Sequence, residues 1–535
     1  MAGLGRTVLA RQRMARLWGL GDRSKPVSFT PGLVVTDEKI ELEMAPFSTT
    51  SDGRIPRGIK LISRAPFAPW ESQENGPILD ASIGHVLPPS LDEADAGEVA
   101  SKGEMLSISW QSLNHDEGLL DDSLNPHVVI LSDALQLANR PGKLVEAIQV
   151  IKRRFPGSLL WAPGIGGPDN CAVLSWFGVD LFDTTRSKQA AAHGAVLTWS
   201  GPRLAIDGED VNSHWKNALA DVRSAISTNR LWELAQSQSL NSPRLVEHMR
   251  NNDKLISSSS GVLSQVVSRD SALRVHSFEG HNDPIILDWV DYICNDYISP
   301  NGLDDVLILL PCSAKKPYSA SRSHKAFRRA INHSSAHEVI VTSPLGLVPR
   351  DLEEVWPAGY YDIPVTGDWT QDEINRVTKM LDSLVSKNQY RIIINHSGLD
   401  YSSDIETIDT RMGAGATSHE ALNRLSEAVS SQMRAKKRSG EKINIDNFRS
   451  VARFHHLNDS WLDDVIVRGR FPRWKVLKDN EQIAMWAPER GGFSLSKACI
   501  KILDANDSLK RISLKQNIKW KGDVNLANLE SYDGS

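Results

Sequence analysis

The densest group of reactive side chains lies in one loop, between Pro311 and His324. The loop reads Pro-Cys-Ser-Ala-Lys-Lys-Pro-Tyr-Ser-Ala-Ser-Arg-Ser-His, so it holds a thiol, two lysine ammonium groups, a phenol, hydroxyls and an imidazole. Nearby cations can lower a cysteine pKa, and a helix start can bind an anion through its backbone N–H groups. The pattern indicates nucleophilic chemistry, and the alternative is a capped strand-to-helix turn with an inert buried cysteine. The spaced glycines of a Walker loop are absent from this sequence.

The elements around this loop are predicted to bring three polar segments together. Apolar runs at 306–310, 339–341 and 392–394 are typical of buried strands, and each stops at a short polar segment. In open parallel sheets, ligands bind beyond the carboxyl ends of the strands. We therefore expect these three strand ends to line one cleft.

Alternating strand and helix patterns predict an α/β fold in several domains. The 535 residues are too many for one ordinary core, and strands that alternate with helices imply parallel pairing. We expect a barrel or doubly wound sheet with a helical extension, a second parallel α/β domain, a small basic α+β domain and a polar tail, at 1–260, 275–426, 430–503 and 504–535.

Composition narrows the class of protein. Hydrophobic residues make up 40% and charged residues 24%, and no apolar run approaches the roughly 20 residues of a membrane helix. The four cysteines are far apart, which argues against a disulfide framework or a Cys-rich zinc site and suits a reducing cytoplasm. We expect no cofactor and no metal. The arginine-rich first twenty residues fit a short basic helix or a frayed terminus better than a transit peptide.

A local basic surface is predicted in the third domain. The net charge is −5, so a nucleic-acid partner is not indicated by the whole chain. The stretch at 434–438 is basic, and the residues after it interleave cations with aromatic side chains. Cations contact phosphates and aromatics stack on unpaired bases, so we expect RNA contacts from Arg468, Arg470, Arg473 and Lys475. A solvated basic face over a small core with Trp461 and Trp474 is the alternative.

The reactive loop also resembles a known signature. Its Pro-Cys-Ser, Lys-Pro-Tyr and Ser…His elements resemble the motif of the archaeosine synthase family, archaeal enzymes that modify tRNA. The loop motif is specific, and the resemblance covers most of 31–503. Supporting segments lie at 160–170, 178–183, 343–350, 356–367 and 467–473.

The resemblance implies a fold, an activity and partners. The family combines a tRNA-guanine transglycosylase-like (β/α)8 barrel with smaller domains, often with a PUA domain last; the residues after Leu503 are too few for one. Its members add the amine of free lysine to the nitrile of 7-cyano-7-deazaguanine in the tRNA D-arm, and a radical SAM partner can complete archaeosine. Another chain could therefore supply tRNA affinity, and a homodimer is a further expectation.

The loop residues permit a mechanism for this reaction. We expect Cys312 to attack the nitrile as a thiolate, Lys316 to lower the pKa of that thiol, and His324 to shuttle protons near neutral pH. Tyr318 and Ser321 would orient the base or the developing imide nitrogen. Direct attack by lysine, with Cys312 merely packing, is the alternative.

Other polar residues at predicted strand ends are candidates for substrate contacts. A bound lysine needs a carboxylate for its α-amine and a donor for its carboxylate. The candidates for substrate contact are Ser313, Arg350, Asp362, Asp368 and His396. The last four are each also typical of surface turns.

The sequence departs from the transglycosylase pattern. The scattered cysteines cannot form its zinc cluster, and the segment 107–111 lacks its first catalytic aspartate. Asp183 matches the nucleophile position, either for base contact or as a strand-end cap. The barrel is therefore expected to be degenerate for base exchange. A non-catalytic tRNA-binding scaffold and a base-exchange enzyme remain alternatives to lysine transfer.

Overall fold

The chain folds as two compact units, residues 1–268 and 269–535, which are described separately. The computed structural model describes residues 5–36, 39–52, 58–64, 78–81, 105–120, 124–258, 272–355, 357–363, 367–454, 466–470, 473–478, 481–487, 492–495 and 519–520. Most of the tail predicted at 504–535, and Trp461, therefore lie outside the described residues. Within the described helices, none is long and apolar enough to cross a membrane.

The first unit is built on an eight-stranded sheet of mixed direction. The strand order is β7-β6-β5-β4-β11-β10-β9-β8, and the five neighbouring pairs from β5 to β8 are parallel. The sheet curls until its edge strands β7 and β8 approach each other, which is compatible with the expected barrel. The strands are β4 (Gly32–Val35), β5 (Phe47–Asp52), β6 (Gly58–Ser63), β7 (Ile78–Ala81), β8 (Met105–Ile108), β9 (Val128–Leu131), β10 (Leu159–Trp161) and β11 (Leu181–Asp183).

Helices cover this sheet, and the helical extension expected in the first domain falls within the segment 211–258. It contains α6 (Val211–Ser227), α7 (Leu231–Ser239) and α8 (Pro243–Ser258). Their apolar faces join the same buried core as α3 (Lys143–Arg154) and α4 (Cys171–Phe177).

The prediction of a helix or a frayed terminus in the first twenty residues is wrong. The segment forms an antiparallel pair, β1 (Arg6–Gln12) and β2 (Ala15–Gly21), which continues into β3 (Pro26–Thr30). Arg13 and Arg16 are buried. The Arg13 guanidinium lies 5.3 Å from the centre of the Trp176 ring, and the Arg16 guanidinium lies 5.4 Å from that of Trp18. Cation–π packing therefore helps to stabilise these two buried charges within the sheet.

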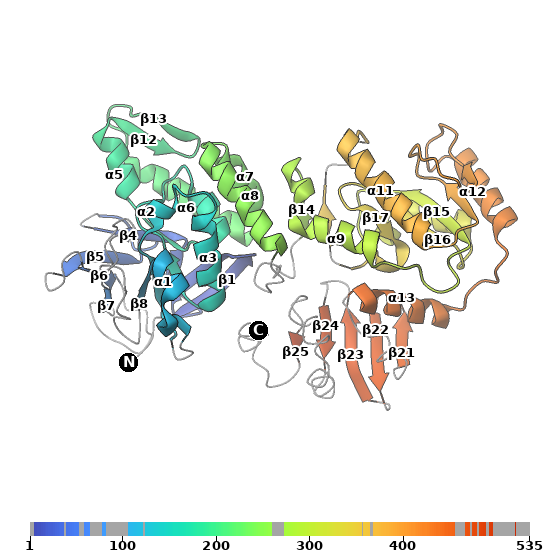
Figure 1. Ribbon diagram of the computed structural model, residues 1–535, viewed down its shortest axis with the longest axis horizontal. Coiled ribbons are helices and arrows are strands. Elements are labelled where there is room, and N and C mark those ends of the chain that lie inside the picture. The colour runs from blue at the N-terminus through green and yellow to red at the C-terminus, as the bar shows by residue number, and fades with distance from the viewer. Residues whose placement is uncertain are drawn as a thin grey trace. The chain divides into compact units, whose positions relative to one another are not determined.

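The second unit contains the parallel sheet that carries the reactive loop (Figure 1). Its strand order is β17-β16-β15-β19-β20, and only β17 is antiparallel to its neighbour. The three expected apolar strands are confirmed as its centre. The strands are β15 (Val306–Pro311), β16 (His337–Thr342), β17 (Gly346–Pro349), β19 (Ile392–Asn395) and β20 (Thr407–Asp409).

Both faces of this sheet are covered because side chains alternate along each strand. Val306, Ile308 and Leu310 pack with α10 (Arg322–Ile331) and α12 (His419–Gln432). Leu307 and Leu309 belong to the core that holds α9 (Pro284–Asn295) and α11 (Gln371–Lys387). The carboxyl end of β15 is therefore held at the centre of a three-layer sandwich.

A final helix and a small sheet follow in the same unit. The helix α13 (Gly440–Phe454) packs on the second-unit core, and its Phe454 ring lies 4.9 Å from that of Tyr292. The boundary predicted at 430 stays a prediction. The small sheet contains β21 (Ile466–Arg470), β22 (Arg473–Lys478), β23 (Glu481–Ala487), β24 (Gly492–Leu495) and β25 (Lys519–Trp520).

Candidate functional site

The reactive loop joins the central strand β15 to helix α10. Val306–Leu310 are fully buried, and the strand stops at Pro311, which has no N–H to donate to a ladder. Helix α10 begins where the Ser321 hydroxyl accepts a hydrogen bond from the His324 backbone N–H at 3.1 Å. Ser321 is thus an N-cap, and its expected catalytic role stays a prediction.

The Cys312 thiol is free and half-buried. Burial raises its pKa above the usual value, and a hydrogen bond with Thr342 and the charge of Lys316 offset this only in part. Lys316 therefore acts on the thiol pKa in the expected direction, but burial has the larger effect and the pKa is raised overall. The thiol is protonated at neutral pH in the absence of substrate.

The Lys316 ammonium interacts electrostatically with the same thiol. Its Nζ is 4.0 Å from the centre of the Tyr361 ring. Burial lowers the pKa of Lys316, while Cys312 and Asp362 raise it. Burial disfavours both the thiolate and the ammonium, so it favours the neutral thiol and shifts Lys316 toward its neutral amine.

The hydroxyl groups of Tyr318, Thr342 and Tyr361 form a hydrogen-bonded cluster next to Cys312 and Lys316. Tyr318 is fully buried, and its hydroxyl donates to Thr342 Oγ1 at 3.2 Å and hydrogen-bonds to the Tyr361 hydroxyl. Thr342 Oγ1 is also 2.7 Å from the Tyr361 hydroxyl. Burial raises the pKa of both phenols, so both stay protonated. Thr342 and Tyr361 were not selected from the sequence as site residues. Thr342 directly follows the strand predicted at 339–341, and Tyr361 lies in the family-like segment 356–367.

His324 is held by Arg350. An Arg350 Nη2–H donates to His324 Nδ1 at 2.9 Å, so Nδ1 is an acceptor and the ring proton resides on Nε2. Burial and the charges of Arg350 and Arg328 lower the pKa of His324 to about 3. The imidazole is therefore neutral at pH 7, and the predicted proton shuttle near neutrality is not supported in this state.

Arg350 is itself fixed by two carboxylates. Its Nε donates to Glu338 Oε2 at 2.9 Å, and its Nη1 donates to Glu353 Oε2 at 2.8 Å. Glu353 also accepts a hydrogen bond from the Ser319 backbone N–H at 3.0 Å, so it ties the loop to Arg350. The contacts with Glu338, His324 and Ser319 join residues 12, 26 and 34 positions apart, so they gave no sequence signal. Arg350 is a positioning residue in this arrangement, and its predicted contact with substrate stays a prediction.

The remaining predicted contacts are dispersed. Ser313 donates from Oγ to the Lys315 carbonyl at 3.1 Å, and Asp362 pairs with His276 at 3.1 Å while influencing Lys316. Asp368 is exposed. His396 is fully buried, and both of its ring nitrogens are occupied by Thr410 and the Ala416 carbonyl.

Asp183 lies in the first unit, at the end of β11. Its carboxylate accepts hydrogen bonds from the backbone N–H groups of Gly164 at 2.8 Å and Thr185 at 2.9 Å, and from Trp161 Nε1 at 3.3 Å. These contacts are those of a strand-end cap, one of the two roles considered for it.

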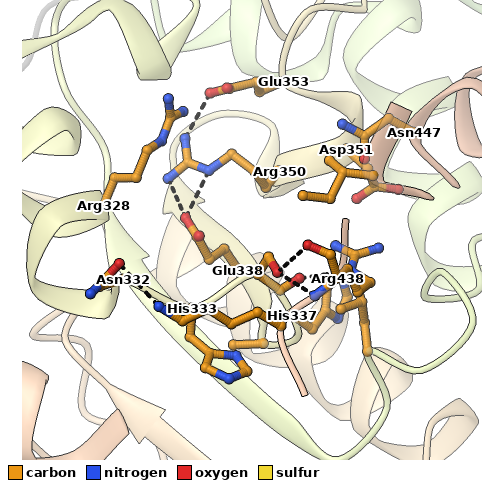
Figure 2. A pocket seen from close by; sticks show the side chains of 15 residues that line it. Arg328, Asn332, His333, His337, Glu338, Arg350, Asp351, Glu353, Arg438 and Asn447 are labelled. Atoms are coloured by element: carbon orange, nitrogen blue, oxygen red, sulfur yellow. Dashed lines mark hydrogen bonds and ion pairs between the residues drawn. The ribbon is translucent and has the colours of Figure 1, made fainter. Parts of the chain in front are cut away.

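A cavity of about 510 Å³ lies on the α10 side of the Arg350 network (Figure 2). Glu338, Arg350 and Glu353 line it, together with Arg328 and Arg438. Cys312 and Lys316 are not among its lining residues, so the cavity shares the positioning network with the loop but not the thiol. Among the side chains that the structure describes, no cluster suited to a metal ion is found.

Comparison with known proteins identifies the family. Archaeosine synthase subunit alpha of Methanosarcina acetivorans is 30% identical over 423 residues, which cover 69% of this chain and 67% of that protein. The chain belongs to the archaeosine synthase family. The subunit alpha of Thermoplasma acidophilum is 29% identical over 69% of this chain and 73% of that protein. Archaeosine synthase of Haloferax volcanii is 26% identical, with coverages of 82% and 81%. Residues 286–429 also match a family described as a domain of unknown function (DUF5591).

In this archaeosine synthase family member, the predicted RNA-binding cations share one face of a hairpin. Arg468 lies opposite Lys475, and Arg470 lies opposite Arg473, in the antiparallel register of β21 and β22. Residues directly opposite each other, and residues two apart, lie on the same face. Trp474 is on the other face and lies opposite Trp486 of β23. The backbone register therefore pairs the four predicted RNA-binding cations with one another across β21 and β22.

The electrostatics of the loop predict how Cys312 responds to pH. Alkylation by iodoacetamide, followed at Cys312 by peptide mass spectrometry, should accelerate only above about pH 9, because burial keeps the thiol protonated. Lys316→Gln removes a charge that favours the thiolate, so it should move the profile to higher pH. Lys315→Gln, at the adjacent exposed lysine, is the matched control and should leave the profile unchanged. A profile with its midpoint near pH 7 would contradict the account.

Proposed function

We propose that this chain modifies tRNA on the way to archaeosine, by joining the amine of free lysine to the nitrile of 7-cyano-7-deazaguanine in the D-arm. Membership of the archaeosine synthase family supports the pathway. The observation that carries the proposal is the group of polar side chains after the carboxyl end of β15, where parallel α/β sheets bind ligands: Lys316 packs on the Tyr361 ring, and the Tyr361 hydroxyl lies 2.7 Å from Thr342 Oγ1, the hydrogen-bond partner of Cys312.

The reaction is proposed to proceed in two balanced steps. The Cys312 sulfur bonds to the nitrile carbon, and the thiol proton passes to the nitrile nitrogen, which gives a thioimidate. The lysine amine then adds to the same carbon, the C–S bond breaks, and the thiol recovers its proton as the amidine forms. Neither step consumes a nucleotide or transfers an electron.

The directions of the pKa shifts at Cys312 and Lys316 suit the first step. Because the thiol starts protonated, a base must take its proton as sulfur attacks. Lys316 is proposed to be that base in its neutral form, since burial lowers its pKa and it interacts electrostatically with Cys312. The Tyr361 and Tyr318 hydroxyls stay protonated and are available to position Thr342 at the thiol.

A partner chain is proposed to act with this one. Two of the relatives described above are named as subunit alpha, which supports a second subunit in those proteins. For this chain we propose a radical SAM enzyme that acts on the lysine adduct.

The central test is mass spectrometry of nitrile-bearing tRNA after incubation with the protein and free lysine. The wild type should yield a lysine adduct on the modified base. Cys312→Ser should reduce the rate by roughly 100-fold or more, the scale expected when a nucleophile is lost. Cys294→Ser removes another partly buried thiol and should retain full activity. Full activity of Cys312→Ser would leave direct attack by lysine as the mechanism.

The basic face of the β21–β22 hairpin is proposed to contact RNA phosphates. Arg468→Glu with Arg470→Glu should weaken tRNA binding and lower the slope of log affinity against log salt by about 1.4–1.8, or 0.7–0.9 for each phosphate contact. Filter binding over a salt series measures both. Lys478→Glu reverses a charge on the opposite face and is the control. An unchanged slope in the double variant would show that the hairpin does not contact RNA phosphates.

A further inference from the structure

We propose that the outer face of α10, together with residues 434–437, binds the phosphate backbone of the RNA strand whose modified base enters the Cys312 loop. We call this surface the α10 cationic face. It comprises seven exposed cations, Arg322, Lys325, Arg328, Arg329, Arg434, Lys436 and Lys437. The inference rests on the proposed function, which it extends by assigning a route for the substrate strand.

The helix itself is strongly one-sided. Four of its ten residues are cations, and it contains no acidic residue. The residues that it buries, His324, Phe327 and Ile331, lie on the face that packs on the sheet. At 3.6 residues per turn Arg322, Lys325 and Arg329 fall on the opposite side, and Arg328 lies at the border between the two; all four are exposed.

A second basic segment is fastened to the end of this helix. Ser335 Oγ donates to the Lys436 carbonyl at 2.7 Å, and Ser334 accepts the Arg438 backbone N–H at 2.7 Å. Lys437 Nζ reaches Asn332 Oδ1 at 3.3 Å. Segments about a hundred residues apart in sequence are thereby combined into one surface.

These cations lack acidic partners in the part of the chain that the structure describes. No ion pair is formed there by Lys325, Arg329 or Lys437, whereas Arg438 is neutralised by Asp446 at 2.8 Å. Like charges three and four residues apart on a helix repel each other. The neighbouring helix α12 mixes charges, with Glu420, Arg424 and Glu427. An uncompensated cationic face is therefore a local feature of α10, which points to an external polyanion.

The position of the face fits a strand that delivers a base to the loop. Helix α10 starts at the Ser321 cap and carries His324 in its first turn, so the cationic face begins where the reactive loop ends. Ten helical residues extend for about 15 Å. Arg328 and Lys437 also line the 510 Å³ cavity, and Figure 2 shows Arg328, Asn332 and His333 on one side of it.

An RNA is favoured over other anionic partners. The chain carries a net charge of −5, so it has no general attraction for polyanions, and the cations cluster beside the group that would react with a base. The surface also lacks the apolar residues that a membrane-inserting face requires, since α10 exposes only charged and small side chains.

The test is tRNA binding by the full chain, measured by filter binding over a salt series without lysine, so that no chemistry is required. Lys325→Glu with Arg329→Glu should weaken binding about tenfold or more near 0.1 M salt and lower the salt slope by about 1.4–1.8. Lys379→Glu reverses one exposed cation of α11, on the other side of the sheet. It is the control for the effect of reversing a charge away from the α10 cationic face. Lys325→Gln with Arg329→Gln should give a smaller loss in the same direction.

The outcomes separate this inference from the proposed reaction. If the reversals abolish binding but the wild type forms no lysine adduct, the surface stands and the reaction fails. If adduct forms and the double variant binds tRNA with the wild-type affinity and slope, the surface is overturned and the reaction stands. Loss of binding to phosphatidylserine vesicles, with tRNA binding intact, would assign the face to a membrane and also overturn the inference.

Discussion

The Arg350 guanidinium bonds to three side chains that come from different parts of the second unit. It donates to Glu338 on β16, to Glu353 and to the imidazole of His324 at the start of α10. Glu353 in turn accepts the Ser319 N–H from the reactive loop. Because removing one partner of a buried ion pair costs about 3–5 kcal/mol, this network fixes the loop strongly against the sheet. It holds the segment between Cys312 and His324 at two points, the Ser319 backbone and the His324 ring.

The same burial that makes the network rigid also sets the charges in the site. His324 is neutral, Cys312 is a thiol and Lys316 is shifted toward the free amine. A nitrile is neutral, and the amine that adds to it must be neutral as well. A desolvated site with weakly charged groups therefore suits amidine formation better than the pre-formed thiolate expected from the neighbouring lysines alone. The charge needed to attract the polyanionic substrate is displaced to the exposed face of α10.

The sequence predicted the central strands and the loop because their signals are local. Buried parallel strands such as 306–310 read as unbroken apolar runs, and a strand-to-helix turn rich in titratable groups can be recognised without a structure. The net direction of the Cys312 pKa shift could not be predicted, because the composition of the loop shows its cations but not how deeply the thiol is buried. The pairing of Arg350 with Glu338 and His324 depends on contacts between residues distant in sequence. The strands at the N-terminus depend on packing of their arginines against distant tryptophans. Family resemblance supplied the reaction, which geometry alone did not specify.

The most direct measurement is intact-protein mass spectrometry after mixing the chain with nitrile-bearing tRNA in the absence of lysine, followed by nuclease digestion and peptide mapping. The account predicts a covalent adduct on Cys312, with the mass of the attached nucleotide and no loss of atoms from either partner, and its release when lysine is added. Formation of lysine-modified tRNA at the full rate, with no adduct at Cys312 under any quench condition and full activity after the thiol is replaced, would contradict it.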